Sequence, residues 1–316
     1  MFNHGWLKEK SFKVATICIG NLAVGGTGKT PHAEWLVRHL VKDGLRVATL
    51  SRGYGRKSKG FVEASPTSTA QDIGDEPLQM FLHFHGTVAV AVCEDRREGI
   101  KKLQEHHPDL DVIVLDDAYQ HRYVLPAVRV LLTEYSRPYW GDHVIPRGRL
   151  RERRKGASRA DVIIVTKCPH NLSDNERWSF CERLSPQPHQ RVFFTSMHYA
   201  SLPICPSSGK IIVVAGIANP QPLLDHLYSE GFEIVDQLIF GDHHNFSCSD
   251  VARLELAAEK AAYVITTAKD NARLQDLPLS SATRSKLIVQ DISVHVLNCD
   301  DNSLYDYIKH SYADHN

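Results

Sequence analysis

Apolar stretches rich in β-branched residues alternate along the first half of the chain with stretches whose apolar residues recur at helical spacing. The segment KVATICIG at 13–20 has the composition of a buried strand, and TPHAEWLVRHLVKDG at 30–44 has helical spacing and ends at a glycine. Buried strands separated by helices are typical of βαβ units with a parallel sheet. Further strands are predicted at 46–51, 87–92, 111–117, 129–134 and 161–167, with helices at 74–84 and 95–107.

A second series of the same kind follows later in the chain. Segments rich in Pro and Ser at 185–190 and 201–209 precede it and predict a hinge near 190–210. We therefore expect an α/β protein with a larger domain over 1–190 and a smaller α/β domain over 191–316. The later strands are predicted at 210–216, 232–240 and 263–270, and the later helices at 220–231 and 249–262.

Composition and charge narrow the class of protein. With 42% hydrophobic and 23% charged residues over 316 positions, the chain has the balance of a globular protein in water. Lys plus Arg and Asp plus Glu both number 37, so no overall charge favours a nucleic-acid partner. Seven cysteines occur singly, which fits a reducing cytoplasm better than a disulfide framework. The start has no apolar signal-peptide core, and the longest apolar run, at 211–218, is too short to span a bilayer.

The stretch GNLAVGGTGKTP at 20–31 lies between the first predicted strand and the first predicted helix. A phosphate-binding loop needs this context, because glycines turn backbone N–H groups toward an anion and the helix adds its positive end. Lys29 is expected to reach the β- and γ-phosphates, and the Thr30 hydroxyl to bind Mg²⁺. Ala23 stands where the motif has its first glycine, a replacement that requires a negative φ. The candidate nucleotide-binding residues are Gly25, Gly26, Thr27, Gly28, Lys29 and Thr30.

The segment DVIVLDD at 111–117 is an apolar strand that ends in two aspartates. A carboxylate at the C-terminal end of a parallel strand is placed to hold Mg²⁺ beside the phosphate loop, as in a Walker B motif. Many strands end in Asp, so this segment indicates a metal site only in combination with the phosphate loop. Asp116 and Asp117 are therefore the candidate metal ligands on this strand.

Two classes of P-loop protein fit the remaining motifs poorly. A GTPase needs N/T-K-x-D after a strand, but TKCP at 166–169 has Pro169 in place of the Asp, and in TAKD the residues Lys269 and Asp270 are adjacent. A partitioning-type ATPase carries a second Lys before the glycine pair, where this chain has Val24. A kinase remains.

The motifs together resemble the tetraacyldisaccharide 4′-kinase family, the lipid A 4′-kinases of Gram-negative bacteria. The resemblance covers residues from about 13 to about 274, with the motifs in the family's order. The chain differs from many members at Ala118, where they have Gly. The matching segments are GNLAVGGTGKTP, SRGYGRKSKG (51–60), GDEP (74–77), EDR (94–96), LDDAYQHR (115–122), PRGRLRE (146–152) and GDHHNFS (241–247).

This resemblance implies a substrate, a fold and a set of residues. Members transfer the γ-phosphate of ATP to the 4′-hydroxyl of a tetraacylated glucosamine disaccharide 1-phosphate, and they have two Rossmann-like α/β domains with the active site in the cleft between them. The implied base is Asp75 paired with His243, assisted by Lys29 and Arg151. The candidate metal ligands are Thr30, Glu76, Asp116 and Asp117, and the candidate substrate contacts are Arg52, Tyr54, Arg151 and Glu152.

Each of these assignments has a structural alternative. The acidic residues of GDEP suit the first turn of a helix, and SRGYG suits a loop after a strand. Asp242, His243 and His244 also allow a metal-binding hypothesis. The alternative function is accordingly a P-loop ATPase that acts as a switch or metallochaperone, with no sugar acceptor.

The segment PRGRLRERRKGASR at 146–159 carries seven Lys or Arg against one Glu. Such a run forms either a solvated face or a surface for anionic lipid. Members of the family usually have an apolar N-terminal helix, whereas about twelve residues precede the first strand here. We therefore expect a cytoplasmic protein that binds the inner-membrane surface peripherally, by electrostatics, with no nucleic-acid partner and no obligate protein partner.

Overall fold

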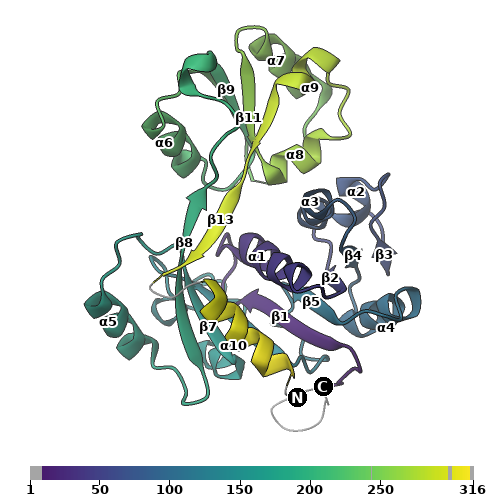
Figure 1. The fold of residues 1–316 in the computed structure, drawn as a ribbon, viewed down its shortest axis with the longest axis vertical. Coiled ribbons are helices and arrows are strands. Elements are labelled where there is room, and N and C mark those ends of the chain that lie inside the picture. The colour runs from purple at the N-terminus through teal and green to yellow at the C-terminus, as the bar shows by residue number, and fades with distance from the viewer. Residues whose placement is uncertain (1–8, 243, 298–300, 314–316) are drawn as a thin grey trace.

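The computed structural model describes residues 9–242, 244–297 and 301–313, which fold around a larger and a smaller β-sheet (Figure 1). In this part of the chain the larger sheet has nine strands, β1 Ala15–Asn21, β2 Val47–Ser51, β3 Val62–Glu63, β4 Ala89–Val92, β5 Val112–Asp116, β6 Val128–Glu134, β7 Val162–Thr166, β8 Arg191–Tyr199 and β13 Ile292–Val296. Their order is β13-β8-β7-β6-β1-β5-β2-β4-β3. All neighbours are parallel except β13 with β8 and β3 with β4, so the centre of the sheet is parallel as predicted.

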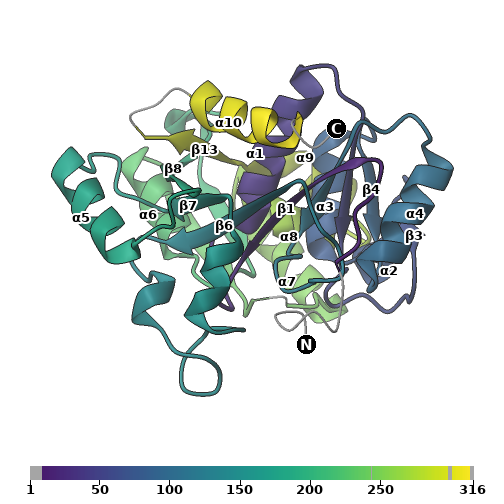
Figure 2. The same cartoon turned by 90° about the horizontal axis from the view of Figure 1, so that it is seen from below.

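Helices cover both faces of the larger sheet. They are α1 Lys29–Lys42, α2 Ala70–Ile73, α3 Asp75–Phe84, α4 Arg96–His106, α5 Asp174–Leu184 and α10 Asp301–Ala313, with 3₁₀ turns η2 Tyr139–Gly141 and η3 Arg154–Arg159. Leu36 of α1 and Ile308 of α10 pack with Ile17 of β1 on one face, where Figure 2 shows α1 beside α10. Leu103 of α4 packs with Leu115 of β5 on the other. Burial on both faces explains why these strands are apolar throughout.

The smaller sheet is parallel, in the order β10-β9-β11-β12. Its strands are β9 Ile211–Ala215, β10 Ile234–Ile239, β11 Tyr263–Thr267 and β12 Leu287–Gln290, with helices α6 Gln221–Ser229, α7 Cys248–Ala258, α8 Ala268–Leu274 and α9 Ser281–Lys286, and the turn η4 Pro206–Ser208. Leu227 of α6 packs on one face and Leu254 of α7 on the other. The smaller sheet and its helices therefore form a second layered unit with its own core.

Two long strands connect the units. Figure 1 shows β8 leaving the larger sheet toward the smaller one and β13 returning beside it. The predicted hinge region 190–210 thus contains strand β8, which pairs with β7. The ends of the range predicted for the smaller domain pack with the larger sheet at residues 191–199, 292–296 and 301–313, and the smaller sheet lies between them in the sequence. The four-stranded unit is therefore an insertion between two strands of the larger sheet.

No helix within residues 9–242, 244–297 and 301–313 is both long and apolar enough to cross a bilayer.

Candidate active site

The phosphate loop spans residues 22–28, between β1 and α1. Gly25 and Gly28 have φ angles of 102° and 84°, in the left-handed region that favours glycine. Ala23 is not among the described residues with positive φ, so an alanine fits at the motif's first position without strain. Gly25 and Gly26 are exposed, which leaves the outer surface of the loop open to an anion.

The inner side of the loop is held by Thr27. Its hydroxyl accepts a hydrogen bond from Asn21 Nδ2 at 2.6 Å, and its carbonyl accepts one from the Thr166 hydroxyl at 2.9 Å. Thr27 is buried, so its side chain faces the protein. The candidate nucleotide contact at this position is accordingly the backbone, while the side chain fixes the loop from below.

A histidine in the first turn of α1 ties the loop to β8. His32 Nδ1 lies 2.7 Å from Gly28 O, and His32 Nε2 lies 2.9 Å from Thr195 Oγ1. Because a carbonyl only accepts, Nδ1 carries the proton and Nε2 accepts from the threonine hydroxyl. Burial lowers the pKa of His32 to about 4, so the ring is neutral at physiological pH. Helical spacing identified His32 only as a helix residue, so this role was missed in the sequence.

The segment 149–151 lies against the phosphate loop although it is far away in sequence. Val24 N donates to Arg149 O at 2.8 Å, and Arg151 N donates to Leu22 O at 2.7 Å. This pairing brings the Arg151 side chain to Asp117, whose two carboxylate oxygens each lie 2.8 Å from Arg151 Nη1. Lys29 Nζ is 3.8 Å from Asp117 Oδ1. The predicted residues Lys29, Asp117 and Arg151 thus meet at one point.

Asp116 ends β5 and is buried beside this cluster. Its Oδ1 has no hydrogen-bond partner among the described residues. Burial, together with the charges of Glu76 and Asp117, raises the pKa of Asp116 to about 7. A buried carboxylate oxygen without a donor, next to two more acidic groups, fits a divalent cation.

The described residues contain no group of three His, Cys, Asp or Glu side chains arranged to hold a metal by itself. This is the ordinary situation for Mg²⁺, which takes one or two carboxylates and completes its shell with water and substrate phosphates. In the DHH motif, His244 pairs with Asp250 at 3.0 Å, and Asp242 accepts from Lys269 Nζ at 3.0 Å. His243 lies outside the described residues.

Asp75 begins α3 and is contacted from the smaller unit. Arg273 of α8 donates from Nε to Asp75 Oδ2 at 3.0 Å, and its Nη1 donates to Asp270 Oδ1 at 3.0 Å and to Gly216 O at 3.1 Å. Asp270 is fully buried and also accepts from Gly216 N. Arg273 is therefore fixed by its own unit and presented to Asp75. Local sequence patterns carry no signal for this contact, because the two residues are 198 positions apart.

The SRGYG segment packs directly against the start of α3. A Cβ on Gly74 would lie 2.9 Å from Tyr54 O, and one on Gly53 would lie 2.9 Å from Ile73 O, so both positions require glycine. Tyr54 is 73% exposed and Arg52 is also exposed. These two candidate substrate contacts are thus on the surface beside Asp75.

Arg96 of the EDR segment is a further residue of the site, and its sequence pattern alone predicts no role for it. It is buried, and its Nη1 donates to Cys93 O at 2.6 Å. Burial lowers the pKa of the Arg96 guanidinium, and the charges of Asp116 and Asp117 oppose that effect. Arg96 therefore supplies a positive charge behind the aspartate pair.

Glu152 is engaged within the protein. Arg159 donates to both of its oxygens, at 2.9 and 2.8 Å, and Gln120 Nε2 donates to Glu152 Oε1 at 3.1 Å. Gln120 also donates to Asn21 O at the end of β1. Through these contacts Glu152 positions the neighbours of the phosphate loop, and its contact with substrate stays a prediction.

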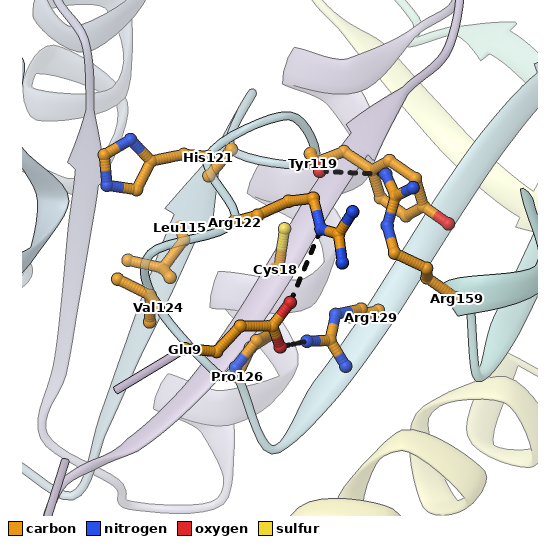
Figure 3. Close-up of a pocket in the computed structure, with 11 residues that line it drawn as sticks. Glu9, Cys18, Leu115, Tyr119, His121, Arg122, Val124, Pro126, Arg129 and Arg159 are labelled. Atoms are coloured by element: carbon orange, nitrogen blue, oxygen red, sulfur yellow. Dashed lines mark hydrogen bonds and ion pairs between the residues drawn. The ribbon is translucent and has the colours of Figure 1, made fainter. Parts of the chain in front are cut away.

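A separate small pocket is lined by Cys18, Leu115, Tyr119 and neighbouring residues (Figure 3). Glu9 lies 2.6 Å from Arg129 and 3.5 Å from Arg122, so the charges here are largely compensated. Burial raises the pKa of the Cys18 thiol to about 12, which leaves it protonated and unreactive. This pocket has no nucleophile and belongs to the interior that supports β1 and β5.

Comparisons with known proteins identify the family of this chain. Residues 1–312 match the family model described as tetraacyldisaccharide-1-P 4′-kinase. The tetraacyldisaccharide 4′-kinase of Bacteroides thetaiotaomicron is 41% identical over 94% of this chain and 84% of its own. That of Flavobacterium johnsoniae is 42% identical over 98% and 92%. The crystal structure of LpxK from Aquifex aeolicus in complex with ATP has a TM-score of 0.74 at 26% identity, over 98% of this chain and 92% of that one. The chain belongs to the tetraacyldisaccharide-1-phosphate 4′-kinase family.

Proposed function

We propose that this protein transfers the γ-phosphate of ATP to the 4′-hydroxyl of a tetraacylated glucosamine disaccharide 1-phosphate. The observation that carries the proposal is the meeting of Lys29 and Arg151 at Asp117, beside the buried Asp116 and in front of an open glycine loop. A loop, a lysine and paired carboxylates in this relation are what phosphoryl transfer requires.

The nucleotide is held by the loop. Backbone N–H groups of Gly25, Gly26 and Gly28 and the N-terminus of α1 bind the phosphates, and Lys29 neutralises the β- and γ-phosphates. Thr30, Asp116 and Asp117 with Glu76 nearby are the proposed metal-binding residues. When bound there, Mg²⁺ neutralises the charge on the phosphates. Arg151 lies on the same side and is proposed to stabilise the charge of the transferring group.

Asp75 is the proposed general base. A sugar hydroxyl is a weak nucleophile at neutral pH, so a carboxylate that accepts its proton as the new O–P bond forms accelerates the attack. The proton moves to a carboxylate oxygen of Asp75, and the bond between the γ-phosphorus and the bridging oxygen of ADP breaks. Arg273 is a positioning residue in this scheme, because it contacts the carboxylate and fixes its orientation. His243 is the proposed second partner of Asp75.

The acceptor is proposed to bind between the two units, where Asp75 of the larger unit meets Arg273 of the smaller one. Arg52 and Tyr54, which lie on the surface next to Gly74, are the proposed contacts for its sugar and phosphate groups. Because such an acceptor carries acyl chains, the protein is proposed to work at the cytoplasmic surface of the inner membrane. The basic run at 146–159 supplies the electrostatic part of that attachment.

The test is a transfer assay with lipid A disaccharide 1-monophosphate dispersed in detergent and ATP labelled at the γ-position. Label in the lipid, dependent on Lys29 and Asp75, is the expected result. ATP hydrolysis at the same rate with and without the lipid, and no labelled lipid, would favour the alternative of an ATPase switch and overturn the proposal.

A further inference from the structure

The loop between η2 and η3 carries exposed apolar side chains. His143, Val144, Ile145, Pro146 and Arg147 are consecutive exposed residues. The apolar side chains in the middle are 39% exposed at Val144 and 51% at Ile145. The teal loop between η2 and η3 projects from the body of the molecule in Figure 2. Its apolar tip is therefore presented to the surroundings.

The backbone of this loop is closed on itself. Ile145 N donates to Leu150 O at 3.0 Å, Leu150 N donates to His143 O at 2.9 Å, and Arg147 N donates to Val144 O at 3.1 Å. At the base, the Asp142 carboxylate accepts from Arg149 N at 3.1 Å. Polar backbone groups are costly to bring near lipid unless they are paired, and most of those in this loop are paired already.

Basic residues lie in the loop and directly after it, and Arg154 Nε donates to Asp142 O at the base of the loop. Arg147, Arg153, Arg154 and Lys155 are exposed, and within the described residues no acidic side chain is paired with any of them. The acidic residues of the segment are engaged elsewhere, Asp142 by Arg149 and Glu152 by Arg159. Apolar side chains at the tip with unpaired cations around the base are the arrangement that binds an anionic interface, where the apolar part enters and the cations meet the headgroups.

The root of the loop is the strand-like segment that pairs with the phosphate loop. Leu150 forms a bridge with Ala23, and the neighbouring Val24, itself 36% exposed, donates to Arg149 O. The next residue, Arg151, contacts Asp117. The tip and the candidate active site are thus ends of one short, hydrogen-bonded segment.

We infer that the loop 142–150 is a membrane contact, in which Val144 and Ile145 enter the interface of an anionic bilayer while Arg147, Arg153, Arg154 and Lys155 bind its headgroups. The inference rests on the proposed function, since an acyl-chain substrate is presented from the bilayer. It adds to the electrostatic attachment an apolar component at a defined place. Salt screens the charged contacts but leaves the apolar one, so part of the binding persists at high salt.

The experiment is co-sedimentation of the full chain with vesicles of phosphatidylcholine and phosphatidylglycerol, over a salt series. The test variant is Val144→Ser with Ile145→Ser. The matched control is Val235→Ser with Ile239→Ser, because these side chains on β10 are 38% and 40% exposed and lie on the smaller unit. The test variant is expected to lower the partition coefficient by about 10-fold or more, since two apolar side chains leave the interface. The control is expected to change it less than about 2-fold.

A gain-of-binding variant guards against misfolding as the cause of a loss. Ile145→Trp is expected to strengthen vesicle binding, because tryptophan favours the membrane interface. Removal of residues 2–8, which contain Phe2, Trp6 and Leu7, is expected to leave the effect of the loop substitutions unchanged. Equal vesicle binding by the wild type and the serine variant, or binding that depends only on residues 2–8, would overturn the inference.

Transfer activity on detergent-dispersed substrate separates this inference from the proposed function. The loop variants are expected to keep wild-type activity there, because the bilayer is absent. Loss of vesicle binding with retained detergent activity supports both proposals. Loop-dependent vesicle binding by a wild-type protein that transfers no phosphate would overturn the proposed function and leave the membrane contact in place.

Discussion

Arg273 and Asp75 join the two units through a side-chain contact, with Arg273 Nε 3.0 Å from Asp75 Oδ2. Both side chains are buried, and Arg273 is braced on its far side by Asp270. The Asp75 carboxylate is held in this orientation as long as the two units stay in contact. The contact makes Asp75 depend on residues that are remote in sequence.

We expect Arg273→Ala to lower kcat for phosphate transfer by about 10- to 100-fold, with a smaller change in the KM for ATP, because the carboxylate loses its positioning partner. Asp75→Ala is expected to cost more. The double variant is expected to be no worse than Asp75→Ala, since Arg273 acts through Asp75. Steady-state kinetics on the four proteins provide the measurement. Arg253→Ala, a change at an exposed arginine of α7, is the control, and fully additive losses would indicate separate roles.

The phosphate loop gives a second prediction. Lys29→Ala is expected to reduce kcat by about 100-fold or more, because the charge that stabilises the transferring phosphoryl group is lost. The free energy of unfolding should change little, since the ion pair of Lys29 with Asp117 is long at 3.8 Å. Turnover close to that of the wild type would remove the P-loop assignment.

His32 predicts a dependence of stability on pH. Its pKa is about 4 in the folded protein and about 6.5 in an unfolded chain. The unfolded chain therefore binds a proton first, so stability falls as the pH drops below about 6.5 and levels off below about 4. The His32→Gln variant lacks this titrating imidazole, so its stability does not change with pH for this reason. The variant should be less stable than the wild type at pH 7.5, and the difference should shrink by ~2–3 kcal/mol by pH 4.

Urea unfolding at several pH values measures this effect, with His189→Gln at an exposed position as the control. A gap between the wild type and His32→Gln that stays constant from pH 7.5 to 4 would show that the pKa of His32 is the same in the folded and the unfolded protein, and would contradict the prediction. The half-buried His121, whose pKa is also lowered to about 4 by burial, contributes to the slope of both proteins equally.

Asp116 predicts the opposite dependence of stability on pH over a similar pH range. The folded protein holds the proton of Asp116 up to about pH 7, whereas an unfolded aspartate loses it near about 3.9. Stability therefore falls as pH rises between these values and is level above them. In the presence of a chelator, Asp116→Asn should be more stable than the wild type by ~4 kcal/mol at pH 8 and equal to it near pH 4. Thermal unfolding across this range is the measurement, and parallel curves for the two proteins would contradict the prediction.

The basic run gives a fifth prediction. Reversal of charge at Arg153, Arg154 and Lys155 should weaken binding to anionic vesicles most strongly at low salt, where screening is weakest. ATP-dependent transfer in detergent should remain, because none of the three contacts the Lys29, Asp117 and Arg151 cluster. Vesicle binding that is unchanged at low salt would make this run a solvated face.

The sequence allowed the centre of the larger sheet to be predicted, because β1, β5 and β7 are short apolar runs with clear helices between them. It did not allow β8 and β13 to be predicted. Both have mixed polar and apolar residues, and their pairing joins Ser293 to His198, which is 95 positions away. Local pattern carries no information on such a partner.

The candidate site divides in the same way. Gly25, Lys29 and Asp117 were found because a loop and a strand end have local signatures. Arg273 and the bracing of Glu152 by Arg159 were not, because long-range pairs of charged residues leave no periodicity in the chain. The role of the buried His32 could not be predicted, because helical spacing does not distinguish it from other polar residues of the helix.

The insertion of the four-stranded unit between β8 and β13 also orders events during synthesis. The ribosome completes residues 211–290 before it makes β13 and α10. The inserted unit can therefore fold while the sheet that carries the phosphate loop still lacks its edge strand and the side chains of Leu304, Tyr305 and Ile308 that cover Ile17. In a nascent chain the inserted unit is thus complete before the larger sheet that carries the phosphate loop has its last strand and its covering helix.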